Sequence, residues 1–159
     1  FMSTQPTTSH CNIEFPTSPT WFRTLRQLIA SATIQCGFSD REAGQVSMAV
    51  DEALSNIYRH GYHGSTDGRV RLTFTTLTTP LPVIRIEIED DAKQVDTDVI
   101  QSRDLQDIKP GGLGVHLIQT VMDNATWVKR NEGGMKLTMS KSATKNSSPT
   151  LQSREKTHG

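Results

Sequence analysis

The stretch Ala49-Val-Asp-Glu-Ala-Leu-Ser-Asn-Ile-Tyr-Arg-His-Gly61 predicts an amphipathic helix that also carries a polar stripe. Its apolar residues recur at helical spacing within an arc of about 100°, which is typical of a face packed on a core. Glu52, Asn56 and His60 recur at every fourth position, advance by about 40° per step and lie mostly on the far side. Such a stripe is typical of a solvated face. A carboxylate and a carboxamide one turn apart can also hold a hard cation such as Mg²⁺, so both interpretations stay open.

The segment before this stretch carries the start and stop signals of two helices. Ser18 followed by Pro19 is typical of a helix start, apolar residues then recur at helical spacing, and Gly37 is placed to end the helix. Ser39 with Glu42 three residues later matches a capping box, which indicates where the quoted helix begins. We therefore expect two consecutive helices.

Alternating apolar and polar residues predict a set of strands around these helices. Two pairs of strands are joined by short polar loops, as in hairpins. This order of elements predicts an α+β fold, a two-layer sandwich with a mixed, mainly antiparallel sheet and three helices on one face. The expected strands are 11–15, 69–76, 83–89, 125–129 and 135–139, and the third helix is expected over 113–122.

The composition indicates one domain without a strong electrostatic field. The 159 residues suffice for one core and are few for two. Seventeen basic residues balance seventeen acidic ones, so we expect neither nucleic acid nor a membrane as a partner. Cys11 and Cys36 lack the spacing of a metal site and are expected to be reduced thiols. Residues 1–9 and 142–159 have little to bury and are expected to be disordered tails around a domain at 10–141.

The sequence carries no signal for membrane insertion or export. No run approaches the roughly 18 consecutive apolar residues of a membrane-spanning helix. The first residues lack the basic and apolar regions of a signal peptide. We therefore expect a cytoplasmic protein.

The strand expected over 83–89 is followed by Asp90 and Asp91. A carboxylate at a strand end can accept a hydrogen bond from an exocyclic amine, which a Lys or an apolar side chain cannot do. Asp is equally typical of the turn that ends a strand. The pattern alone does not decide between a ligand contact and a turn.

Glycines lead directly into the third helix in the stretch Lys109-Pro-Gly-Gly-Leu-Gly-Val-His116. Backbone N–H groups at a helix start form an anion site, and glycine allows close approach. Glycine-rich connectors without ligands are also common, and the stretch matches neither a P-loop nor a dinucleotide fingerprint. The long polar loop over 90–112 is typical of a functional or mobile segment.

Taken in order, these stretches resemble the gyrase, chaperone and histidine-kinase ATPase superfamily, and within it the small bacterial anti-sigma factor serine kinases. The resemblance covers most of residues 11–141 and implies the Bergerat-type ATP-binding fold, with ATP and Mg²⁺ held under a mobile lid. Residues 49–62 are similar to the family's Glu-x-x-x-Asn-x-x-x-His box, 87–96 to its adenine-binding box, 111–123 to its glycine box and 132–141 to its terminal hairpin.

The resemblance also implies roles for single residues. Asn56 would ligate Mg²⁺, Asp90 would bind adenine, and Glu52 would be the general base toward a seryl hydroxyl. A carboxylate beside the attacking hydroxyl suits phosphoryl transfer, which depends on positioning and charge neutralisation. His60 is expected to be structural or supporting, and Lys109 either reaches a terminal phosphate or is a solvated loop lysine. The implied nucleotide contacts are Asn56, Asp90, Ala92, Lys109, Gly112, Leu113, Gly114 and Val115.

Three positions depart from the family's pattern. Ala92 and Gln94 stand where relatives usually hold Gly and then a second small residue or Pro, and Met135 stands where many place Thr. Because Ala restricts positive φ, the turn near adenine is expected to be altered. Met135 removes a hydroxyl expected at the adenine end. Neither change touches Glu52 or Asn56.

Three functions follow from the residues and the resemblance. The leading one is a serine/threonine kinase that uses ATP and Mg²⁺ to phosphorylate an anti-anti-sigma protein and that also sequesters a sigma factor. The second is a non-catalytic partner-switch module with weak or structural nucleotide binding, which Ala92, Gln94 and Met135 favour. The third, the ATPase domain of a sensor histidine kinase, is disfavoured because no phosphoacceptor helix pair precedes residue 18. A homodimer is implied by the resemblance alone.

Overall fold

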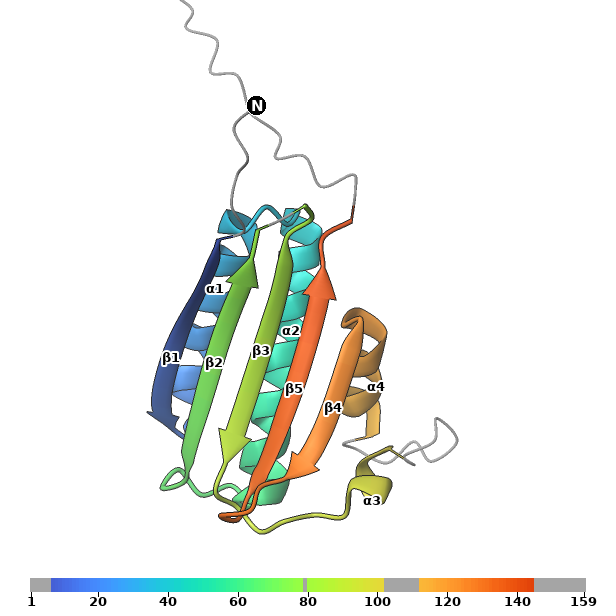
Figure 1. Ribbon diagram of the computed structural model, residues 1–159. Coiled ribbons are helices and arrows are strands. Elements are labelled where there is room, and N and C mark those ends of the chain that lie inside the picture. The colour runs from blue at the N-terminus through green and yellow to red at the C-terminus, as the bar shows by residue number, and fades with distance from the viewer. Residues whose placement is uncertain (1–6, 79, 102–111, 145–159) are drawn as a thin grey trace, which may run out of the picture.

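The computed structural model describes residues 7–78, 80–101 and 112–144 of the chain (Figure 1). Ten elements follow one another in these ranges. They are β1 (Thr8–Pro16), α1 (Pro19–Gln35), α2 (Asp40–Asn56), the π-turn η1 (Ile57–Gly61), β2 (Arg69–Leu77), β3 (Val83–Asp90), α3 (Thr97–Gln101), α4 (Gly112–Val121), β4 (Asn124–Lys129) and β5 (Met135–Ser142).

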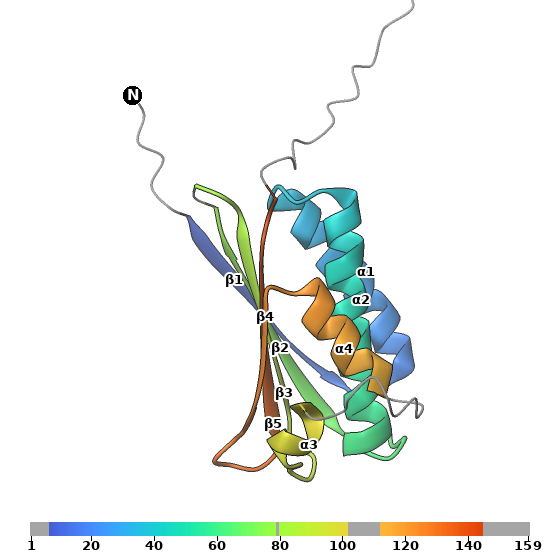
Figure 2. The same ribbon diagram turned by 90° about the vertical axis from the view of Figure 1, so that its right-hand side faces the viewer.

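These elements form two layers. One layer is a five-stranded sheet, and helices α1, α2 and α4 cover one of its faces (Figure 2). The predicted two-layer α+β fold is therefore confirmed. The strand pairings in the described ranges are all antiparallel.

The sheet brings the ends of β3 and β5 together. Its strand order is β1-β2-β3-β5-β4, so β3 lies in the middle with β2 and β5 as neighbours. The register pairs Glu89 of β3 with Lys136 of β5, which puts Asp90 next to the turn between β4 and β5. Alternate residues of the central strands are buried under the helices: Val70, Leu72, Phe74, Ile84, Ile86, Ile88, Leu137 and Met139.

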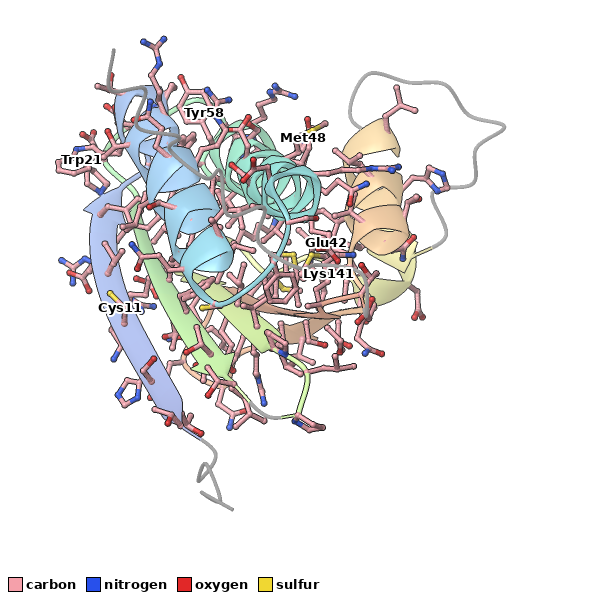
Figure 3. The ribbon with its side chains drawn as sticks, turned by 90° about the horizontal axis from the view of Figure 1, so that it is seen from above. Cys11, Trp21, Glu42, Met48, Tyr58 and Lys141 are labelled. Carbon is pink, nitrogen blue, oxygen red and sulfur yellow. The ribbon has the colours of Figure 1, made fainter. Side chains whose placement is uncertain are left out.

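Helix α2 begins as the sequence predicts. Ser39 Oγ accepts a hydrogen bond from Glu42 N at 3.3 Å, and Glu42 Oε2 accepts one from Ser39 N at 2.9 Å. The predicted capping box is thus confirmed. α2 lies between α1 and α4 (Figures 2 and 3), and Val50 and Leu54 on its inner side are fully buried. None of the helices in the described ranges is long and apolar enough to cross a membrane.

The strands at both ends of the domain are longer than predicted. β1 begins at Thr8, three residues before the expected strand, because it pairs with β2 along its whole length and Ser9 Oγ lies 2.7 Å from Thr76 Oγ1. Thr8 and Ser9 therefore belong to the sheet and not to a tail. β5 runs to Ser142, and the next residue, Ala143, is buried. The other residues assigned to tails, apart from Thr7 and Thr144, lie outside the described ranges.

Candidate functional site

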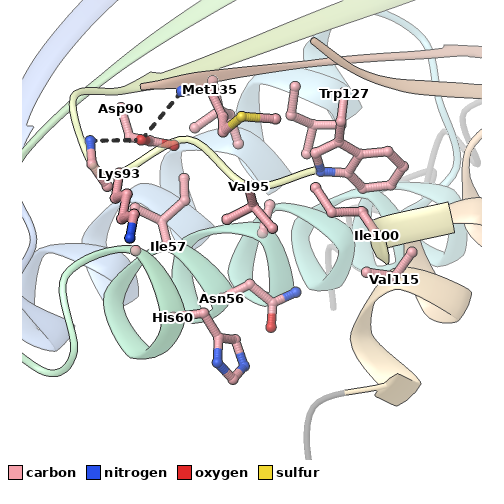
Figure 4. A pocket seen from close by; sticks show the side chains of 15 residues that line it. Asn56, Ile57, His60, Asp90, Lys93, Val95, Ile100, Val115, Trp127 and Met135 are labelled. Carbon is pink, nitrogen blue, oxygen red and sulfur yellow. Dashed lines mark hydrogen bonds between the residues drawn. The ribbon is translucent and has the colours of Figure 1, made fainter. Parts of the chain in front are cut away.

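A pocket opens between α2, η1, α4 and the ends of β3 and β5 (Figure 4). It holds about 730 Å³ of space that protein atoms do not fill, part of it open to solvent. A mostly apolar lining with few polar groups is typical of small-molecule sites. The lining residues are Ala53, Asn56, Ile57, His60, Gly61, Ile88, Asp90, Ala92, Lys93, Val95, Ile100, Val115, Trp127, Met135 and Leu137.

Asp90 ends β3 and contributes a buried carboxylate to this pocket. Its Oδ1 accepts hydrogen bonds from the backbone N–H groups of Ala92, at 2.9 Å, and Met135, at 3.3 Å (Figure 4). Burial raises the pKa of Asp90, and these two hydrogen bonds oppose the rise. The bond from Ala92 is a turn interaction. No residue of the described ranges hydrogen-bonds to Oδ2, so this oxygen remains available to a ligand.

The turn between β4 and β5 holds the end of β3 in place. Arg130 Nη1 donates to the backbone oxygen of Asp90 at 2.7 Å and to Asp91 Oδ1 at 2.8 Å. A Cβ on Gly134 would overlap the backbone oxygen of Asp90, so only glycine permits this approach. Arg71 and Arg130 together hold the pKa of Asp91 well below its usual range. Arg130 was not predicted as a site residue, because nothing in the sequence around it indicates a contact with the end of β3.

The three departures from the family's pattern leave the pocket open. Among the described non-glycine residues only His63 has a positive φ, so Ala92 keeps an ordinary backbone conformation. Gln94 Nε2 donates to the backbone oxygen of Arg130 at 2.6 Å, which ties the segment after β3 to the β4–β5 turn. Met135 is buried and lines the pocket. These residues therefore support the pocket instead of filling it.

Asn56 is the last residue of α2, and its side chain lines the pocket (Figure 4). Its Oδ1 is buried and has no hydrogen-bond partner in the described ranges. An unpaired buried amide oxygen is costly, and a bound cation would satisfy it. No group of three or more His, Cys, Asp and Glu side chains in these ranges could hold a metal. Asn56 fits Mg²⁺, because this ion commonly binds through one or two protein oxygens together with waters and substrate phosphates.

The predicted stripe on the quoted helix divides between two surfaces. Helix α2 gives way to a π-turn after Asn56, with a hydrogen bond from Tyr62 N to Ile57 O at 3.0 Å. Asn56 and His60 both line the pocket. Glu52 does not line this pocket and faces a second hollow.

Gly114 lets α4 approach α2 where the two functional side chains lie. A Cβ on Gly114 would be 2.6 Å from Glu52 Oε2 and 3.2 Å from Asn56 Nδ2. The absence of a side chain at Gly114 therefore leaves room for both groups. Glu52 and Asn56 are one turn apart on α2, and the start of α4 lies close to both, although Asn56 lines the pocket and Glu52 lines the second hollow.

The other residues expected around the phosphates lie in different surroundings. Val115 is buried and lines the pocket, whereas Leu113 is 63% exposed and lines the second hollow. Gly112 is the first residue of α4. Lys109 lies outside the described ranges.

Lys93, Val95, Ile100 and Trp127 are among the pocket residues that the sequence did not predict as site residues. Val95 lies in the segment between β3 and α3, and Ile100 lies in the short helix α3. The irregular sequence pattern of this segment gave no indication that either residue lines a pocket. Trp127 follows the alternation of β4, which indicates an inward side chain and not a ligand contact. Lys93 is three residues beyond Asp90, and this short distance along the chain was the only feature of the sequence that could have indicated that Lys93 lines the pocket.

The chain is similar to known proteins over most of its length. A family model described as "Histidine kinase-like ATPase domain" matches residues 15–141. The chain is 26% identical over 137 residues to "Serine-protein kinase RsbW" of Bacillus subtilis, which covers 83% of this chain and 84% of that protein. It is 27% identical over 128 residues to "Serine-protein kinase RsbW" of Bacillus pumilus, which covers 76% and 78%.

A solved structure shares the fold. The RsbU and RsbW domains of Rv1364c from Mycobacterium tuberculosis match with a TM-score of 0.59 at 16% identity, over 84% of this chain and 32% of that longer chain. This likeness concerns the fold alone. The family match spans most of the chain and confirms the superfamily resemblance read from the motifs. The chain belongs to the family of histidine kinase-like ATPase domains.

Proposed function

We propose that the chain is a serine/threonine kinase that transfers the γ-phosphate of ATP, in the presence of Mg²⁺, to a protein acceptor. The observation that carries this proposal is the close approach of Gly114 to both Glu52 and Asn56. A carboxylate suited to an acceptor hydroxyl and an amide oxygen suited to a cation then lie one helical turn apart. The relatives named serine-protein kinases support the same reaction.

The nucleotide would lie in the pocket that contains Asp90. Asp90 Oδ2 would accept a hydrogen bond from the exocyclic amine of adenine, and apolar side chains such as Ile88 and Met135 would contact the ring. The phosphates would extend toward the start of α4, where the backbone N–H groups of Gly112, Leu113, Gly114 and Val115 favour an anion. A phosphate contact from Lys109 is part of the same proposal.

Each side chain has a distinct task in this reaction. ATP with Mg²⁺ supplies the transferable phosphoryl group and neutralises its negative charge. Asn56 Oδ1 would ligate the cation, which would also bind the phosphates of ATP. Glu52 would accept the proton of the seryl hydroxyl as its oxygen attacks. Gly114 would leave the space that both side chains require.

We also propose that the acceptor is an anti-anti-sigma protein and that the chain sequesters a sigma factor. The motif resemblance and the serine-protein kinase relatives support this assignment. A cytoplasmic location is part of the same proposal.

A homodimer is proposed on the surface beside β1. Trp21 and Leu28, two turns apart on α1, are 49% and 45% exposed, and β1 is an edge strand. Figure 3 shows Trp21 on the side of α1 that lies next to β1. Exposed apolar side chains beside an open strand edge suit a contact with a second copy.

Phosphoryl transfer with the purified chain tests the kinase proposal. The chain is incubated with γ-labelled ATP, Mg²⁺ and each anti-anti-sigma-type protein of the same organism. We expect label on a serine or threonine of one of them, and Glu52→Gln should lower the transfer rate by about 100-fold or more while nucleotide binding persists. A full transfer rate in Glu52→Gln would remove Glu52 as the base. Nucleotide binding without transfer to any acceptor would favour a non-catalytic binding module.

A further inference from the structure

The second hollow lies between α2 with η1 and α4, separate from the nucleotide pocket. α2 and η1 contribute Glu52 and Arg59, and α4 contributes Leu113, Gly114, His116 and Leu117. The two hollows share no lining residue among those described. A Cβ on Gly114 would come close both to Glu52, which lines the second hollow, and to Asn56, which lines the nucleotide pocket. The second hollow is open and holds about 1000 Å³ of unfilled space, including open solvent.

Among the described lining residues of the hollow, Glu52 carries a negative charge and Arg59 a positive charge, and these two side chains do not form an ion pair with each other. No carboxylate of the described ranges lies within ion-pair distance of the Arg59 guanidinium. Glu52 likewise has no cationic partner there. Arg59 is exposed, so its charge is available to an incoming group.

Exposed apolar side chains flank the Glu52 carboxylate. Leu113 at the start of α4 is 63% exposed, and Met48, one turn before Glu52 on α2, is 52% exposed. Figure 3 shows Met48 on the outer surface of the helix layer. Apolar side chains next to one carboxylate and one guanidinium form a surface suited to a polypeptide segment.

We infer that this hollow binds the serine-bearing segment of the acceptor protein, with the acceptor hydroxyl at Glu52 and an acidic side chain of the same segment at Arg59. The inference rests on the proposed kinase function and adds a determinant of acceptor choice. An acidic partner is chosen for two reasons. No carboxylate in the described part of the chain pairs with the Arg59 guanidinium, and Glu52 repels acidic groups from the hydroxyl position.

The spacing between the two charges sets a distance within the acceptor. Arg59 lies seven positions after Glu52, the last three of them in η1, and seven steps correspond to at most roughly 10 Å at the α-helical rise of 1.5 Å per residue. An extended segment covers this length in about three residues at about 3.3 Å each. The acidic residue is therefore expected about three positions from the acceptor serine.

The test uses the acceptor that the wild-type chain phosphorylates, with steady-state kinetics for Arg59→Glu and Arg59→Gln. We expect KM for the acceptor to rise about tenfold in Arg59→Glu and less in Arg59→Gln. KM for ATP and the thermal midpoint should stay near wild type. Arg41→Glu, an exposed arginine at the other end of α2, is the matched control and should leave KM for the acceptor unchanged.

The second part of the test exchanges the charges of Arg59 and of the acidic residue in the acceptor. Replacing the acidic acceptor residue by Lys should raise KM with the wild-type chain and restore it with Arg59→Glu. An unchanged KM for the acceptor in a folded, active Arg59→Glu chain would overturn the inference and leave the kinase proposal intact. If the wild-type chain labels no acceptor at all, the proposed function fails and the inference fails with it.

Discussion

Replacing Gly114 by Ala would place a methyl group against both groups on which the proposed reaction depends. The new Cβ would lie 2.6 Å from Glu52 Oε2 and 3.2 Å from Asn56 Nδ2. Non-bonded heavy atoms prefer roughly 3.5 Å or more, so the Glu52 carboxylate must move by about 1 Å. Asn56 has to move by a few tenths of an ångström.

The stability of this variant should hardly change. Ala is favoured over Gly inside a helix by about 0.5–1 kcal/mol, and the atoms that must move are the ends of flexible side chains. The matched control is Gly44→Ala in α2, where a Cβ would meet nothing within 4 Å. We expect this control to gain up to about 1 kcal/mol and to keep its transfer rate.

The transfer rate should respond strongly. A misplacement of about 1 Å in a reacting group can cost roughly 100-fold in rate, so Gly114→Ala should lose about that factor at saturating substrates. Urea unfolding followed by circular dichroism measures stability, and transfer of labelled phosphate measures the rate. A folded Gly114→Ala chain with wild-type transfer would refute the assignment of Glu52 and the role of this close approach.

Three further variants test the surroundings of the pocket. Asp90→Asn should weaken ADP binding by about 10- to 100-fold in calorimetry. Since burial raises the pKa of Asp90, ionisation costs stability as the pH rises through that value, so the variant should be as stable as wild type or more stable at pH 8. Gly134→Ala should unfold at much lower urea than Gly133→Ala. Both glycines have positive φ, but only the Gly134 Cβ meets the Asp90 backbone. Asp91→Asn should lower the urea midpoint at pH 7, because Arg71 and Arg130 hold the pKa of Asp91 down. This difference should vanish as the pH falls from about 4 through the lowered pKa; a constant difference would contradict the ion pairs.

Local rules account for the parts of the fold that the sequence predicts. Ser39 and Glu42 form the capping box that their spacing indicates, because such a box involves only one turn of helix. The alternation over 83–89 gives β3, because one face of this strand is buried under the helices. The resemblance identified Asn56 and Asp90, and both line one pocket.

Local sequence rules did not predict features that depend on residues far away in the sequence. The length of β1 is set by pairing with β2, and not by its own weak alternation. The chain forms a π-turn after Asn56, and the helical periodicity of the sequence gives no indication of it. Arg130 holds the end of β3 from forty residues further along the chain. The sequence likewise did not show that Ala92 would have an ordinary, negative φ.

Calorimetric titration with ATP, with and without Mg²⁺, tests the central claim that the Asp90 pocket holds a nucleotide whose cation is bound by Asn56. Wild type and Asn56→Ala are compared. We expect wild type to bind ATP and Mg²⁺ to tighten that binding by about tenfold. Asn56→Ala should keep the Mg²⁺-free affinity and lose the enhancement. No binding at millimolar ATP, or the same Mg²⁺ enhancement in both chains, would contradict the account.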